Sequence, residues 1–260
     1  MKELVNDFIA EQSLVDTLVA DLTEEQWMLP MPGCEMWNIK DAIIHLAFYD
    51  YAANKLMNGE AEDLKQISTE EAKNDEYIRS TAYRGMSGKE VLAWWRRERT
   101  TLAAAFLKMD PKDRIPWAPG FPMSARSLCS ARAMELWAHS VDIYDTLGKD
   151  IPVHDRITGT LFLSWQSRNF AYMINGETLP DTPMYLELTL PSGEKWVKGE
   201  PNAENYIKGS AKDWALVAVR RRNWMDTGLE VVGEEARRYA SIVQTYAGKA
   251  DPAPAAKNPR

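Results

Sequence analysis

The stretch Arg132-Ala-Met-Glu-Leu-Trp-Ala-His-Ser-Val-Asp-Ile143 places a carboxylate and a histidine four residues apart within a largely apolar segment. Side chains at positions i and i+4 lie on one face of an α-helix, one turn apart. Glu135 and His139 are therefore expected to point towards a single centre. Asp142 adds a second carboxylate three residues after the histidine. The stretch predicts a helix that carries candidate metal ligands.

A second histidine, His45, lies in another segment with helical character. Asn38 can cap this helix, and Asp41 falls in its first turn, where a carboxylate favours the helix dipole. His45 can meet Glu135 and His139 across a bundle of helices. Two imidazoles and one carboxylate leave coordination positions for water or substrate, which is typical of a catalytic zinc site. Nickel, iron(II) or manganese suit similar ligands.

Each of these residues also has a plainer interpretation. A Glu-x-x-x-His pair occurs on many helices as a salt bridge, and a histidine such as His45 on an apolar helix is often a hydrogen-bonded core residue. Asp41 and Asp142 are most simply capping or surface carboxylates. Alternatively, one of them accepts a hydrogen bond from the free ring nitrogen of a ligand histidine. The third histidine, His154, follows Pro152 and is expected in an exposed linker.

Four segments with helical periodicity precede residue 150, and they predict an N-terminal four-helix bundle over residues 1–150. Their bounds are residues 2–22, Asn38 to about Asn58, Ser87 or Gly88 to Leu107, and Ser124 or Ser127 to Gly148. Residues 59–86 are polar and charged, and we expect a connection there with one short helix around Thr69–Ser80. Prolines between Pro111 and Pro122 mark the connection before the fourth helix.

The remainder of the chain predicts a smaller α+β domain over residues 151–248, so the fold class is α+β. Tyr185–Leu190 alternates with period two and is followed by the turn Pro191-Ser-Gly193, which indicates a β-hairpin that continues over Glu194–Gly199. The other expected elements are helices at 156–174, Lys212–Arg222 and Glu234–Tyr246 and a strand at Tyr206–Ser210. Residues 249–260 are rich in proline and alanine, and we expect a disordered tail.

Composition narrows the functional classes. Hydrophobic residues make up 45% of the 260, which is ample for a core, and the formal net charge is −7. An acidic chain without a basic stripe is a poor candidate for binding nucleic acid. No stretch reaches the roughly 18–20 apolar residues of a membrane helix, and the N-terminus lacks the apolar run of a signal peptide. Cys34 and Cys129 cannot form a disulfide framework. We expect a cytoplasmic protein with reduced thiols, a small-molecule substrate and no membrane partner.

The segments Trp37–Leu46 and Arg132–Ile143 resemble the two metal motifs of the DinB-like superfamily, in particular its mycothiol-dependent maleylpyruvate isomerase branch. Gly209–Arg222 and Ile242–Gly248 resemble the C-terminal part of an uncharacterised bacterial metal-binding subfamily, so the resemblance covers about residues 1–248. It implies an up-down-down-up bundle. It also implies that His45, Glu135 and His139 hold a divalent metal, most simply Zn²⁺.

The resemblance further implies chemistry with a low-molecular-weight thiol such as mycothiol. A bound metal lowers the pKa of a thiol, and the thiolate adds to an electrophilic carbon of an unsaturated keto acid. The outcome is isomerisation or thiol transfer. Candidate substrate-binding residues are Trp37, which can wall a pocket, and Arg132, Arg84 and Arg222, whose guanidinium groups suit a carboxylate. The plainer interpretation of each arginine is a solvated surface cation.

Two other classes of function remain open at the level of sequence. In a metal-dependent hydrolase, metal-bound water attacks the substrate and no thiol is needed. In a non-catalytic protein, the bundle binds metal and the α+β half binds a partner or ligand. Either a monomer or a homodimer is compatible with the sequence.

Overall fold

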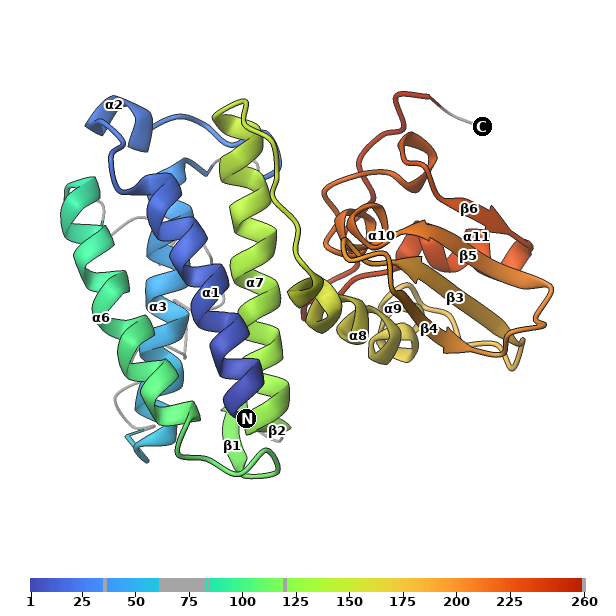
Figure 1. Ribbon diagram of the computed structural model, residues 1–260, viewed down its shortest axis with the longest axis horizontal. Helices are drawn as coiled ribbons and strands as arrows, with labels where there is room; N and C mark the ends of the chain where they lie inside the picture. Colours follow the sequence, from blue (N-terminus) through green and yellow to red (C-terminus); the bar gives the residue numbers. More distant parts are fainter. Residues whose placement is uncertain (35–36, 61–82, 84, 119–120, 259–260) are drawn as a thin grey trace. The chain divides into compact units, whose positions relative to one another are not determined.

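The computed structural model describes residues 1–34, 37–60, 83, 85–118 and 121–258 (Figure 1). The chain divides into two compact units, Met1–Asp150 and Ile151–Arg260, and this division coincides with the boundary expected after residue 150. The short helix expected around Thr69–Ser80 lies outside the described residues.

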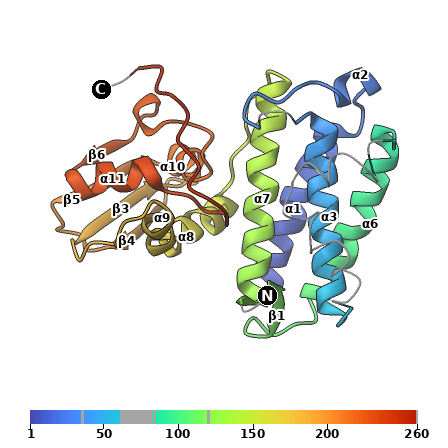
Figure 2. The same cartoon turned by 180° about the vertical axis from the view of Figure 1, so that it is seen from behind.

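The first unit is a bundle of four long helices, as the periodicity predicted. They are α1 (Lys2–Val19), α3 (Ile39–Met57), α6 (Gly88–Phe106) and α7 (Ala125–Thr146), with the short helix α2 (Glu24–Trp27) between the first two. Helices α1 and α7 run in one direction and α3 and α6 in the other, so the topology is up-down-down-up (Figures 1 and 2). The expected bundle is therefore confirmed.

Local sequence explains where three of these helices begin. Asn38 caps α3 in a capping box with Asp41, and Ser87 caps α6 in the same way with Glu90. In each box the cap side chain accepts a hydrogen bond from a backbone N–H that has no partner within the helix. Ser124 caps α7 by accepting from the backbone N–H of Ser127. The caps of α3 and α7 set where the two helices that carry the candidate ligands begin.

One core fills the bundle, and every long helix contributes large side chains to it. Among the fully buried residues are Phe8 of α1, Ile43 of α3, Trp95 and Leu102 of α6 and Leu128 of α7. Burial of such a side chain stabilises the fold by about 1.5–3 kcal/mol. None of the helices in the described part of the chain combines the length and apolar character needed to cross a lipid bilayer.

The proline-containing connection before α7 is an antiparallel hairpin rather than an irregular loop. Its strands are β1 (Arg114–Ala118) and β2 (Phe121–Ser124). Pro116 and Pro122 lie within them, which a two-stranded ribbon tolerates because each strand has a free edge. This hairpin was not expected from the sequence, since prolines usually argue against strands.

The second unit has a four-stranded sheet in the order β4-β3-β5-β6. Strands β3 (Met184–Thr189) and β4 (Lys195–Gly199) form the expected hairpin. Strand β5 (Asn205–Ser210) runs parallel to β3, and β6 (Glu230–Val232), which was not expected, forms the edge of the sheet beside β5. The helical elements of this unit are η1 (Asp155–Ile157), α8 (Thr158–Gln166), α9 (Arg168–Ile174), α10 (Ala211–Ala218), η2 (Trp224–Asp226) and α11 (Glu234–Ile242).

Three expectations for this unit need correction. The helix expected to reach Arg222 ends at Ala218, and Arg220 takes a left-handed φ of 61°. Helix α11 stops at Ile242, four residues short of the expected end at Tyr246. The described part of the tail, 249–258, is anchored instead of disordered, because the Arg220 guanidinium donates to the backbone oxygen of Asp251 at 2.8 Å.

Candidate metal centre

Helices α3 and α7 bring three donor atoms together inside the first unit. His45 of α3 and Glu135 and His139 of α7 each offer one ligand atom, and these atoms lie within 4.8 Å of one another. Nε2 of His45 is 3.4 Å and Nε2 of His139 is 3.6 Å from the same oxygen, Oε2 of Glu135. Both distances exceed the usual N–H···O separation of about 2.9–3.0 Å. They resemble the separation of about 3.4 Å between neighbouring ligands of a tetrahedral zinc ion. The donor set therefore fits a divalent cation.

Asp142 fixes the orientation of the His139 ring. Its Oδ2 lies 3.2 Å from Nδ1 of His139, and the carboxylate is fully buried. When Nδ1–H donates to Asp142, the other ring nitrogen keeps its lone pair and faces Glu135. A carboxylate behind a ligand histidine has this function in metal sites. Of the two aspartates considered from the sequence, Asp142 takes this place, whereas Asp41 accepts from the backbone N–H of Asn38 at 3.1 Å in the cap of α3.

Aromatic rings hold the two imidazoles in place. The Trp37 ring stacks on His139 with 5.3 Å between centroids and 10° between planes, and its centroid is 5.1 Å from that of His45. Tyr49 packs against His45 at 4.7 Å. Trp37 is only 7% exposed. This residue, expected to bind substrate, thus forms a wall against both histidines, and its contact with substrate stays a prediction.

Burial and mutual hydrogen bonding set the charges of the site. Burial would raise the pKa of Glu135, but the neighbouring imidazoles of His139 and His45 outweigh it and hold this pKa well below its usual range. Burial lowers the pKa of His45. Burial would also lower the pKa of His139, yet its hydrogen bond with Asp142 and the nearby Glu135 carboxylate raise it above its usual value of 6.5. An anionic carboxylate thus lies between two imidazoles with different proton affinities.

These shifts predict how metal affinity depends on pH. A cation needs the unprotonated Nε2 of His139, so protons compete with it once the pH falls through the raised pKa of this histidine. We expect the dissociation constant to rise by about tenfold for each pH unit below that pKa. Asp142→Asn removes the charge that raises the pKa, so the loss of metal should begin at a lower pH. Chelator competition between pH 5 and pH 8 measures the onset.

The same measurement on His154→Ala is the control, because His154 is exposed and belongs to the second unit. In this variant, the loss of metal should begin at the same pH as in the unaltered protein. An identical onset in the Asp142→Asn variant would contradict the role assigned to Asp142.

The three arginines expected to bind substrate have different outcomes. The expectation that Arg132 binds substrate needs correction, because its side chain is only 4% exposed and its Nε donates to Asp50 at 3.0 Å. A guanidinium committed to a buried carboxylate is not available to a substrate. Arg84 lies outside the described residues. Arg222 is in the second unit, where its Nη1 donates to the backbone oxygen of Arg221 at 2.8 Å, and its contact with substrate stays a prediction.

Two further residues, which were not expected at the site, lie beside the candidate ligands. Tyr49 contacts His45, as described above. Cys34, expected only to be a reduced thiol, has its Sγ within 4.8 Å of donor atoms of His139 and Asp142. The position of Cys34 three residues before Trp37 was the available signal for the cysteine. Tyr49 carried a signal too, since it lies four residues after His45 on the same helix.

Comparison with known proteins identifies the family of this chain. Residues 9–144 match the model of the mycothiol maleylpyruvate isomerase N-terminal domain. The chain belongs to the mycothiol maleylpyruvate isomerase family. Uncharacterised relatives in this comparison come from Mycobacterium tuberculosis strains CDC 1551 and H37Rv, each 33% identical over 246 residues, which is 94% of this chain and 95% of the relative.

Solved structures of the maleylpyruvate isomerase family share the fold. The crystal structure of the mycothiol-dependent maleylpyruvate isomerase has a TM-score of 0.58 and 16% identity, covering 85% of this chain and 89% of that chain. A mutant of the same enzyme gives the same values. At this identity the likeness establishes the fold alone, and the resemblance to the family stated from the sequence is confirmed.

Proposed function

We propose that this protein is a divalent-metal-dependent enzyme that activates a low-molecular-weight thiol for addition to a small unsaturated carbonyl or carboxylate substrate. The reaction is an isomerisation or a thiol transfer. The observation that carries the proposal is the convergence of His45, Glu135 and His139 from two helices on a region 4.8 Å across. Membership of the mycothiol maleylpyruvate isomerase family supports the thiol and the substrate class.

The residues of the chain have separate tasks in this proposal. A divalent cation supplies the charge that lowers the pKa of a bound thiol. Glu135, whose pKa is held well below its usual range, brings a negative charge that favours the cation. Asp142 keeps the His139 ring turned so that Nε2 faces the centre. Trp37 excludes water from one side, since its buried ring lies flat against His139.

Three protein ligands match the number found in catalytic zinc sites, where a fourth position is left for water or substrate. Structural zinc sites use four ligands of the protein. Among the described residues, the group of His45, Glu135 and His139 therefore suits a catalytic site, where a bound thiol or water can exchange, better than a structural site with four protein ligands. Zn²⁺ is the cation proposed, and Ni²⁺, Fe²⁺ and Mn²⁺ are the alternatives that imidazole and carboxylate ligands accept.

The proposal is tested on protein purified without a histidine tag. Metal content is measured by mass spectrometry, and turnover of a cis-unsaturated dicarboxylic keto acid is followed with and without mycothiol. We expect about one metal ion per chain and turnover only in the presence of the thiol. Glu135→Gln should lower both metal content and turnover, whereas the exposed His154→Ala should change neither.

Other outcomes identify the rival functions. Metal-dependent hydrolysis of an ester or amide without any thiol would replace the proposed chemistry by that of a hydrolase. One metal ion per chain without turnover of any of these substrates would indicate a binding protein. Absence of metal after reconstitution would overturn the proposal. The segments Trp37–Leu46 and Arg132–Ile143 would then serve only to pack the core.

A further inference from the structure

A buried ion pair lies next to the candidate metal centre. Nε of Arg132 on α7 is 3.0 Å from Oδ1 of Asp50 on α3, and the two side chains are 4% and 3% exposed. Nε1 of Trp95 on α6 donates to the other oxygen, Oδ2, at 3.2 Å. The pair therefore ties three helices of the bundle together at one level, and no step of the proposed chemistry uses it.

The same arginine makes two contacts that lead to His45. Its Nη2 donates to the backbone oxygen of Leu46, the residue after His45, at 3.2 Å. Its guanidinium carbon lies 5.6 Å from the centroid of the Tyr49 ring, and that ring packs on His45 with 4.7 Å between centroids. Arg132 is also three residues before Glu135 on α7. It thus bridges the two helices at the point where their ligands face each other.

The two histidines differ in how they are held. His139 has Asp142 as a hydrogen-bond partner for Nδ1. Nδ1 of His45 is buried and has no hydrogen-bond partner within the described part of the chain. A ligand histidine is normally oriented by a hydrogen bond from its second ring nitrogen. His45 therefore depends on packing, and Tyr49 is one of the rings that supply it.

We propose that Asp50 and Arg132 are positioning residues of the metal centre, which act through Tyr49 and the backbone of α3 to hold His45 at the correct distance from Glu135. This inference rests on the proposed metal site. Asp50 fixes the guanidinium plane, the plane supports the Tyr49 ring, and the ring limits the rotation of the imidazole.

Conservative substitutions test the chain of contacts without leaving a buried charge alone. Arg132→Lys keeps a cation beside Asp50 but loses the planar group that lies over the Tyr49 ring and also reaches Leu46. Tyr49→Leu removes the ring between the guanidinium and His45. Metal affinity is measured by competition with a chelator, and the visible spectrum of bound Co²⁺ reports the ligand geometry. Thermal unfolding of the metal-free proteins reports stability separately.

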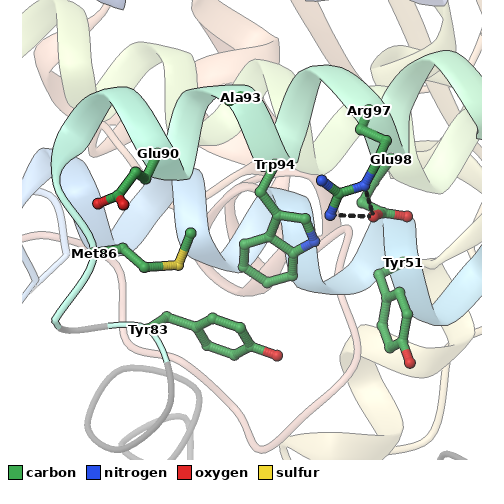
Figure 3. Close-up of a pocket in the computed structure, with 8 residues that line it drawn as sticks. All are labelled: Tyr51, Tyr83, Met86, Glu90, Ala93, Trp94, Arg97 and Glu98. Atoms are coloured by element: carbon green, nitrogen blue, oxygen red, sulfur yellow. Dashed lines mark hydrogen bonds and ion pairs between the residues drawn. The ribbon is translucent and has the colours of Figure 1, made fainter.

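Arg99→Lys is the matched control for the arginine. Arg99 pairs with Asp16, donates to the backbone oxygen of Gln12 at 2.8 Å and lies over the Trp95 ring at 4.4 Å. It makes the same three kinds of contact, but with α1 and α6 and with neither histidine. Tyr51→Leu is the control for the tyrosine, because Tyr51 lines a surface pocket with Tyr83 and Trp94 (Figure 3).

We expect Arg132→Lys and Tyr49→Leu to weaken metal binding by about 10–100-fold, the range for residues that orient metal ligands, and to alter the Co²⁺ spectrum. The two controls should lower thermal stability by similar amounts and leave affinity and spectrum unchanged. Equal affinities in the variants and their controls would overturn this inference alone. An unaltered protein that binds no metal would overturn the proposed function and the inference together.

Discussion

Replacement of His139 by alanine is expected to reduce bound metal from about one ion per chain to almost none, with a loss of affinity above about 100-fold. His139 is one of the three proposed ligands, and its Nδ1–H also donates to the Asp142 carboxylate. Loss of a ligand exceeds the 10–100-fold effect of losing a residue that merely orients one. Metal content by mass spectrometry and chelator competition measure the change.

Unfolding must be separated from loss of the ligand. Alanine is the best helix former, so the backbone of α7 should persist, although buried Asp142 loses its partner at a cost of about 1–3 kcal/mol. His139→Gln is the second variant, because its amide can still donate a hydrogen bond. Helical content by circular dichroism should stay close to that of the unaltered protein for both. Unchanged metal stoichiometry in either folded variant would mean that the ligand assignment is wrong.

The sequence predicted the part of the site that depends on local geometry. Glu135 and His139 are four residues apart, and helix geometry alone brings them to one face. His45 is 90 residues before Glu135, so its place at the site followed from a bundle in which α3 packs on α7. Asn38 was recognisable as a cap, and Ser87 and Ser124 as alternative first residues of their helices, because a helix start is also a local feature.

Features that depend on distant partners were not predictable in this way. Arg132 was assigned to the substrate because an arginine beside candidate ligands suits a carboxylate, and only the position of Asp50 reveals that the carboxylate belongs to the protein. The tail was expected to be disordered from its composition, but Asn223 donates to the backbone oxygen of Pro254 at 2.8 Å. Strand β6 has three residues, too few for a period to be recognised.

The second large effect concerns the buried pair itself. Asp50→Leu should destabilise the metal-free protein by about 3–5 kcal/mol, because it leaves the Arg132 guanidinium buried without a countercharge. The double variant Asp50→Leu/Arg132→Leu should recover most of this loss, since an apolar pair of similar size is often as stable as a buried ion pair. Denaturant unfolding of the metal-free proteins measures both free energies.

The expected recovery follows from the cost of burying Asp50. Burial raises the pKa of its carboxyl above the usual value despite the neighbouring Arg132. When the pKa of a carboxyl is higher in the folded state than in the unfolded state, the protein loses stability as the pH rises from the unfolded pKa through the folded one. The ionised Asp50 carboxylate therefore costs free energy of folding at neutral pH. A buried ion pair of this kind is weak evidence for a net gain in stability. A double variant that is as stable as the unaltered protein but binds metal more weakly would show that the pair positions His45 and is not needed for stability. A double variant as unstable as Asp50→Leu would instead make the pair a structural requirement of the bundle.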